Sequence, residues 1–130
     1  MANTRILPIY NATRAFIVDY AKVYERIKNL HKHRVGAFVY DKSLELVSCI
    51  VRANRYEAGS KERVSALQDY LDLLDEIVCG LRVAKDIQAI DEKASARLSE
   101  KIVQLTKQSK GWKNHTEASV SEFTDSGRDA

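Results

Sequence analysis

Turn-forming residues are scarce in this chain of 130 residues, which contains one proline and five glycines. An all-β fold needs many tight turns, so this composition argues against one. Alanine, leucine, isoleucine, valine, lysine and glutamate are common instead, and 45% of the residues are hydrophobic. The chain is long enough for one domain with a real core and too short for two ordinary domains. We therefore expect a single all-α domain.

Long apolar runs are also missing. No stretch approaches the roughly 20 apolar residues of a membrane span, and residues 1–16 lack the charged-then-apolar pattern of a signal peptide. The sequence therefore predicts a cytoplasmic protein without a membrane partner. Cys49 and Cys79 lie in apolar helical patterns without a Cys-x-x-Cys motif, so we expect buried free thiols rather than a disulfide or a zinc site.

Apolar side chains recur at three- and four-residue spacing along four segments, which is the spacing of one helical face. In the first segment, Thr13 stands at the step where the apolar pattern is interrupted. The third segment carries a leucine stripe and shows the clearest helical pattern. The segments run from about residue 7 to 30, from Phe38 to the turn at Gly59, from Val64 to Ala84, and from Glu92 to Trp112.

Capping residues stand at the expected ends of these segments. Pro8 fits a first helical turn, where its missing N–H costs nothing. Gly59 and Ser60 are typical of a helix end followed by a helix start, and Asp91 is a typical N-cap. Residues 31–36 break the apolar pattern and predict a connection. Four amphipathic helices with short connections predict an antiparallel up-and-down four-helix bundle.

The composition changes after Trp112, the only tryptophan. Residues 113–130 are polar and acidic and show no periodicity, so they cannot bury enough apolar surface to offset the entropy of ordering. We therefore predict a helical domain at 1–112 and a disordered tail at 113–130. Trp112 continues the apolar stripe of Leu98 and Leu105, which favours packing in the last helical turn over an exposed ring that stacks on a base.

The sequence contains none of the familiar motifs by which residues perform catalysis or bind metals. The histidines lie in the predicted connection and tail, and the Glu-x-x-His pairs of di-metal bundles are missing. The sequence also has no Gly-x-Ser-x-Gly elbow, no glycine-rich phosphate loop and no suitably paired cysteine. Asp69, Asp72 and Glu76 recur at helical spacing away from the leucine stripe, as on a solvated face. We predict a non-enzymatic protein with no catalytic residue, metal or cofactor.

Positive charge is concentrated in the first half of the chain. Residues 1–63 carry twelve Lys/Arg against six Asp/Glu, a net charge of +6, whereas acidic residues prevail in 64–91. This asymmetry indicates a basic surface for phosphate or an acidic partner, and a separate acidic face. Ordinary solubilising charge is the alternative for either basic cluster alone. One cluster comprises Arg26, Lys28, His31, Lys32, His33 and Arg34, and the other comprises Arg52, Arg55, Lys61 and Arg63.

Four stretches carry a family resemblance: LPIYNATRAFIVDYAKVYERI (7–27), LVSCIVRAN (46–54), LQDYLDLLDEIVCGLRVAKDIQAID (67–91) and GW (111–112). In this order they resemble the accessory variability determinant proteins of diversity-generating retroelements. Those proteins belong to a wider family of four-helix-bundle proteins that includes the product of intervening sequences in bacterial ribosomal RNA genes. The resemblance covers roughly residues 6–113.

The resemblance implies a non-catalytic accessory subunit. Proteins of this family form a homopentamer of bundles with a positively charged surface, and they bind nucleic acid. They associate with the retroelement's reverse transcriptase while cDNA is made from a template RNA. The alternative is a general bundle module, similar to the ribosomal intervening-sequence protein, whose partner is not a polymerase.

Candidate contact residues follow from charge and expected exposure, once the family role is assumed. Arg52 and Arg55 are the first choices for contacts with nucleic acid or polymerase. The other candidates are Arg14, Lys22, Arg26, Lys28, Lys32, Arg34, Lys61 and Arg63.

Overall fold

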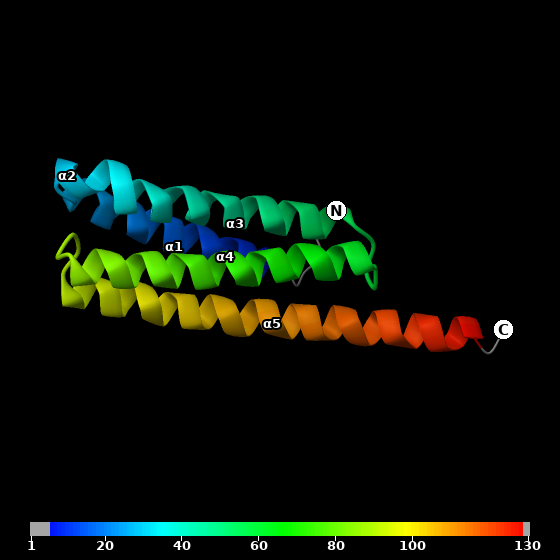
Figure 1. The fold of residues 1–130 in the computed structure, drawn as a ribbon. Helices are drawn as coiled ribbons and strands as arrows, with labels where there is room; N and C mark the ends of the chain where they lie inside the picture. Colours follow the sequence, from blue (N-terminus) through cyan, green and yellow to red (C-terminus); the bar gives the residue numbers. More distant parts are fainter. Residues whose placement is uncertain (1–5, 129–130) are drawn as a thin grey trace.

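The computed structural model describes residues 6–128, and all regular structure in this range is helical. Side chains are described for residues 8–118. The four long helices are α1 (Ile6–Arg26), α3 (Ala37–Arg55), α4 (Lys61–Asp86) and α5 (Glu92–Arg128), and they lie side by side (Figure 1). A short helix α2 (Asn29–His31) and a π-helical segment η1 (Lys32–Gly36) join α1 to α3. The all-α prediction is confirmed for the described residues, and the arrangement is compatible with a helical bundle.

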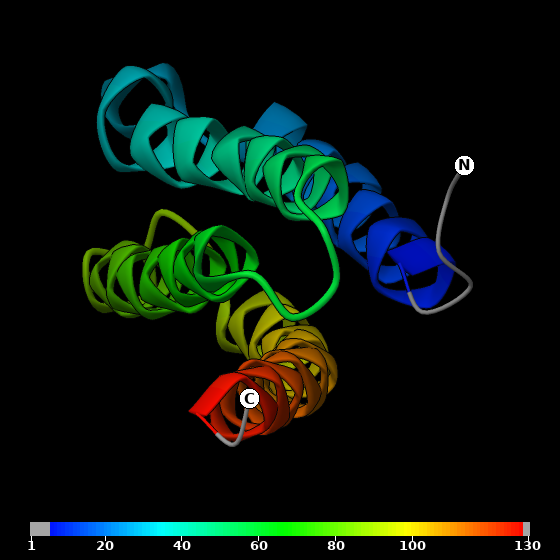
Figure 2. The ribbon, with the colours of Figure 1, turned by 90° about the vertical axis from the view of Figure 1, so that its right-hand side faces the viewer.

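The four long helices surround a common core in the order α1, α3, α4, α5 (Figure 2). The connection between α3 and α4 lies at one end of the molecule. The α2–η1 segment and the connection between α4 and α5 lie at the other end (Figure 1). None of the described helices combines the length and apolar character needed to cross a bilayer.

The helix starts at Ser60 and Asp91 are confirmed by side-chain caps. Ser60 Oγ accepts a hydrogen bond from the Arg63 backbone N–H at 3.1 Å, and Asp91 Oδ1 accepts one from Ala94 N–H at 2.7 Å. Each cap satisfies an amide that has no partner within its helix. Gly59 has φ 83°, a left-handed conformation that costs glycine little, so the predicted turn is confirmed.

Buried side chains from all four long helices form one core. The leucine stripe predicted for α4 is at its centre, with Leu67, Leu74 and Leu81 at most 1% exposed. Thr13 is also fully buried, and its hydroxyl donates to the Ile9 carbonyl at 2.7 Å. Oxygen atoms of Thr13 and Tyr70 lie 2.7 Å apart. A polar residue thus fits the apolar face of α1, because its hydroxyl has partners inside the core.

The connection predicted at 31–36 is helical, and α1 ends at Arg26 rather than near residue 30. Lys28 has an extended backbone, which separates α1 from α2. The Tyr20 hydroxyl then donates to the Gly36 carbonyl at 2.7 Å and ties the end of η1 to α1. Apolar periodicity does not predict the α2–η1 segment, because the segment has no apolar stripe and is held by the hydrogen bond from Tyr20 of α1.

Helix α5 extends past the boundary predicted after Trp112. Residues 113–128 of the predicted disordered tail are helical, and Thr116 is 2% exposed. The Thr116 hydroxyl donates to the Trp112 carbonyl at 2.9 Å, and Lys113 pairs with Glu117 at 3.0 Å. Composition did not reveal this extension of α5, because the buried residue Thr116 is polar and bonds back to its own helix.

Candidate nucleic-acid interface

The two predicted basic clusters lie at opposite ends of the molecule. The first is carried by the end of α1 and by the α2–η1 segment. The second lies around the connection between α3 and α4 (Figure 1). Within one chain they therefore do not form a single continuous surface.

Arg52, a first-choice contact residue, already forms an ion pair within the chain. Its Nη2 lies 2.6 Å from Oδ2 of Asp69 on α4, and this hydrogen bond raises the pKa of the guanidinium. Its Nε is buried without a hydrogen-bond partner among the described residues. Arg55, three residues later, is exposed and has no ion pair with a described acidic residue. Of the two first choices, Arg55 is therefore the one with an available charge.

Arg63 is buried, and this corrects its selection as a contact residue. The side chain is 5% exposed, although the selection rested on charge and exposure. Its Nε donates to the Ala53 carbonyl at 2.9 Å and its Nη2 to the Tyr56 carbonyl at 2.7 Å. Burial lowers the pKa of Arg63, and the negative end of helix α3 offsets part of that cost. Arg63 thus closes the end of α3 and does not face solvent.

Most of the remaining candidates are exposed on the surface. Arg14 lies over the Tyr10 ring at 5.7 Å from its centre, and Lys32 lies over Tyr24 at 5.3 Å. Lys32 is half-buried and also reaches the Glu25 carbonyl at 3.4 Å. The exposed candidates without an ion pair to a described acidic side chain are Arg14, Lys22, Arg26, Lys28, Arg34 and Lys61.

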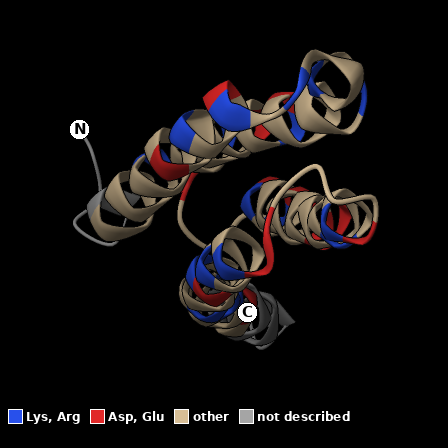
Figure 3. Ribbon diagram, turned by 90° about the vertical axis from the view of Figure 1, so that its left-hand side faces the viewer, with Lys and Arg blue, Asp and Glu red and all other residues tan. Residues whose placement is uncertain are grey.

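Further basic residues, missed by the sequence prediction, lie on α5. Lys101 pairs with Asp19 of α1, and Arg97 lies one turn before it. The hydrogen bond from Lys101 lowers the pKa of Asp19, and the charges of Lys101, Arg97 and Lys22 lower it further. Cations from α1 and α5 therefore gather around one carboxylate. Figure 3 shows Lys and Arg on α1, on the α2–η1 segment and on the first turns of α5.

The signal for these α5 residues was the spacing of Lys93, Arg97 and Lys101, which places them on one helical face. It was missed because charge was summed over the first half of the chain. Summation along the chain cannot show that the start of α5 lies beside the end of α1.

The acidic face predicted on α4 is exposed, as expected. Asp69, Asp72 and Glu76 all face solvent, and Glu76 lies 3.6 Å from Lys42 of α3. In the described part of the chain, no three His, Cys, Asp or Glu residues are grouped to hold a metal ion. Cys49 is buried as predicted, but Cys79 is exposed on the outer side of α4, so the prediction of two buried thiols is wrong for Cys79.

Comparisons with models of protein families, with curated proteins and with solved structures found no match to this chain. A functional interpretation therefore depends on the surface of the chain and on the sequence resemblance to the accessory variability determinant proteins.

Proposed function

We propose that this protein is a non-catalytic accessory subunit of a diversity-generating retroelement. In this role it binds the reverse transcriptase of the element, and its template RNA or cDNA, through a basic surface. The proposal includes a cytoplasmic location, an antiparallel up-and-down bundle and a ring-like homo-oligomer, with a pentamer as the order that the resemblance implies. In a ring, basic ends that are separate in one protomer would adjoin those of neighbouring copies.

One observation carries the proposal. The end of α1 and the α2–η1 segment present Arg26, Lys28 and Arg34 to solvent, and no described acidic side chain forms an ion pair with them. By contrast, Lys42, Arg52 and Lys101 are paired within the protomer. An unpaired exposed cation is free to contact a phosphate and release the counterion bound there. This end of the molecule is therefore the first place to look for nucleic acid.

Salt dependence tests the phosphate contacts. Each contact to a single strand contributes about −0.7 to the slope of log K against log salt concentration. Binding of a single-stranded RNA would be followed by fluorescence anisotropy at several salt concentrations. For Lys28→Gln/Arg34→Gln we expect the slope to become shallower by about 1.4, because two contacts are lost. Lys107→Gln/Lys110→Gln changes two exposed cations in the middle of α5, away from this end of the molecule. It is the matched control and keeps the wild-type slope.

Co-purification with the reverse transcriptase of the same element tests the partner. We expect stable association and template-dependent cDNA synthesis with the wild type and with the Lys107→Gln/Lys110→Gln control. Lys28→Gln/Arg34→Gln should reduce association, synthesis or both. If the wild type neither associates with the polymerase nor stimulates synthesis, the accessory role is wrong.

The second candidate function is a bundle module with a partner other than a polymerase. It is favoured by exposed apolar side chains near the same end of the molecule. Phe38 of α3 is 43% exposed, and Val83 and Ile87 of α4 are 50% and 44% exposed. A Cβ placed on Gly80 would lie 3.2 Å from the Phe38 ring, so Phe38 lies against the helix that carries the other two. Failure of polymerase association, combined with salt-independent RNA binding, would favour this second function.

A further inference from the structure

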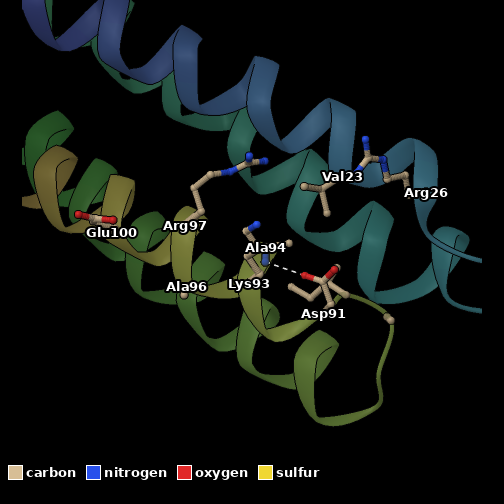
Figure 4. A pocket seen from close by; sticks show the side chains of 10 residues that line it. Val23, Arg26, Asp91, Lys93, Ala94, Ala96, Arg97 and Glu100 are labelled. Carbon is tan, nitrogen blue, oxygen red and sulfur yellow. Dashed lines mark hydrogen bonds between the residues drawn. The ribbon is translucent and has the colours of Figure 1, made fainter.

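A pocket of about 630 Å³ opens between the last turns of α1 and the start of α5 (Figure 4). Val23 of α1 lines one side, and Ala89 and Ile90 from the connection before α5 line another. Ala94 and Ala96 contribute small side chains from α5. The volume lies within the range of pockets that hold small ligands. Because these lining side chains are apolar, this part of the wall suits the uncharged portion of such a ligand.

Three cationic side chains from two helices stand around this pocket. Arg26 comes from α1, and Lys93 and Arg97 come from α5. In Figure 4 the guanidinium of Arg97 and the ammonium of Lys93 extend from α5 toward α1. All three residues are exposed, and none forms an ion pair with an acidic side chain in the described part of the chain. Their charges are therefore available to a ligand in the pocket.

The acidic residues that line the pocket do not cancel these charges. Asp91 accepts a hydrogen bond from Ala94 N–H at 2.7 Å and lies at the positive end of α5, which offsets its charge. Glu100 lies at the far side of the pocket from Arg26 (Figure 4). The nearby carboxylate of Asp19 is paired with Lys101.

From this arrangement we infer that the pocket binds a phosphate group. Arginine offers a planar fork of N–H donors that fits two phosphate oxygens, and lysine adds a mobile positive charge. Arginines on opposite sides of the opening, at Arg26 and Arg97, contact one phosphate from two directions. The phosphate belongs either to a free nucleotide, whose base or sugar lies on the apolar wall, or to the backbone of a nucleic acid. The inference does not require a reverse transcriptase.

The test compares probes with and without phosphate. Calorimetric titration uses AMP and adenosine, and fluorescence anisotropy uses a single-stranded RNA of about 15 nucleotides, within the range of single-strand binding sites. The variant is Lys93→Gln/Arg97→Gln, with Lys107→Gln/Lys110→Gln as the control for charge. Because all four residues are exposed, both variants should fold, and thermal melting of each checks this.

If a free nucleotide is the source, AMP binds, adenosine does not, and the pocket variant loses about tenfold or more in AMP affinity. If a nucleic-acid backbone is the source, AMP does not bind, and RNA affinity falls about tenfold in the pocket variant alone. Either result supports the phosphate site. It is overturned if AMP and adenosine bind equally, or if the pocket and control variants bind both AMP and RNA as the wild type does.

Failure of this inference is distinguishable from failure of the proposed function. Lys28 and Arg34 are not among the residues that line the pocket. If RNA binding depends on these two residues but not on Lys93 and Arg97, and the pocket variant also leaves AMP binding unchanged, the pocket is removed as a site and the accessory role stands.

Discussion

The guanidinium of Arg63 lies 5.6 Å from the centre of the Trp112 ring. Through this contact one side chain of α4 joins the middle of α5 to the end of α3, where it bonds the Ala53 and Tyr56 carbonyls. A cation over an indole face is stabilised by the ring quadrupole, more so when both groups are desolvated. Trp112 itself is 6% exposed. The single tryptophan is therefore a packing residue, and its face is covered by a buried arginine.

Replacement of the tryptophan should mainly reduce stability. Trp112→Ala removes a large buried side chain, so we expect the free energy of unfolding to fall by about 3–5 kcal/mol. Urea unfolding followed by circular dichroism measures this loss, and Trp112→Phe should recover part of it. An unchanged midpoint together with weaker RNA binding would mean that the ring is exposed in solution and contacts a base.

Arg63→Lys tests whether the geometry of the guanidinium matters beyond its charge. Lysine keeps the positive charge but lacks the fork that bonds the Ala53 and Tyr56 carbonyls at once. A buried carbonyl without its partner costs about 1–3 kcal/mol, which sets the expected loss of unfolding free energy. Arg55→Lys is the exposed control and should leave the unfolding curve unchanged. Equal curves for both variants would contradict a structural role for Arg63.

Gly80 and Gly111 should respond differently to replacement by alanine. A Cβ on Gly80 would lie 2.7 Å from Cγ2 of the buried Val39, whereas nothing lies within 4 Å of a Cβ on Gly111. Each Gly→Ala change gains about 1 kcal/mol of helix propensity, but overpacking typically costs about 1–3 kcal/mol. Thermal melting should show Gly111→Ala stabilised and Gly80→Ala unchanged or destabilised. Equal stabilisation of both variants would mean that α3 moves away from α4 at no cost.

Two buried phenols should make the protein sensitive to alkali. Burial raises the pKa of Tyr20 and of Tyr70 well above the ordinary value of 10.0. The unfolded state therefore loses these protons first, so the stabilising contribution is complete below pH 10 and decreases as the pH rises above it. Tyr20→Phe should weaken this alkaline destabilisation. It should also cost about 1–3 kcal/mol at neutral pH, because the Gly36 carbonyl loses its donor.

Urea unfolding between pH 7 and 11 measures both effects. Tyr56, which is 36% exposed, provides the control Tyr56→Phe, and this variant should follow the wild-type curve. A Tyr20→Phe curve parallel to that of the wild type above pH 10 would show that Tyr20 ionises without unfolding.

The ion pair of Asp19 and Lys101 should make the stability of the protein depend on pH under acidic conditions. The folded-state pKa of Asp19 is lowered below 3.8, first by the hydrogen bond from Lys101. Its stabilising contribution is therefore present above about pH 4 and is lost as the pH falls through the folded-state pKa. Asp19→Asn should reduce the free energy of unfolding at pH 7 by up to about 1 kcal/mol. On acidification, the free energy of unfolding should then fall less in this variant than in the wild type. If the free energies of unfolding of the wild type and of Asp19→Asn differ by the same amount at pH 7 and at pH 2.5, the ion pair makes no such contribution.

The number of long helices, the N-caps of α4 and α5 and most of the core could be predicted from the sequence. Ser60 and Asp91 cap helices through bonds to residues three positions away, and the stripe from Leu67 to Leu81 follows the period of a helix. Such features depend on residues that are neighbours along the chain, so their signal lies in spacing alone. The exposed cations of the α2–η1 segment were predicted on the same local basis, although the segment's helical form was not.

Whether each basic side chain is paired, buried or available to a partner was decided only by the tertiary structure. By sequence Arg52, Arg63 and Arg97 are equivalent basic residues of helices. The fold pairs Arg52 with Asp69, buries Arg63 beneath Trp112 and places Arg97 at a pocket beside α1. Which charges stay free for a partner depends on which helical faces meet, and packing between segments distant in the sequence sets those faces. The sequence by itself therefore determined the four long helices and the starts of α4 and α5, and helix packing determined which of their cations are available to phosphate.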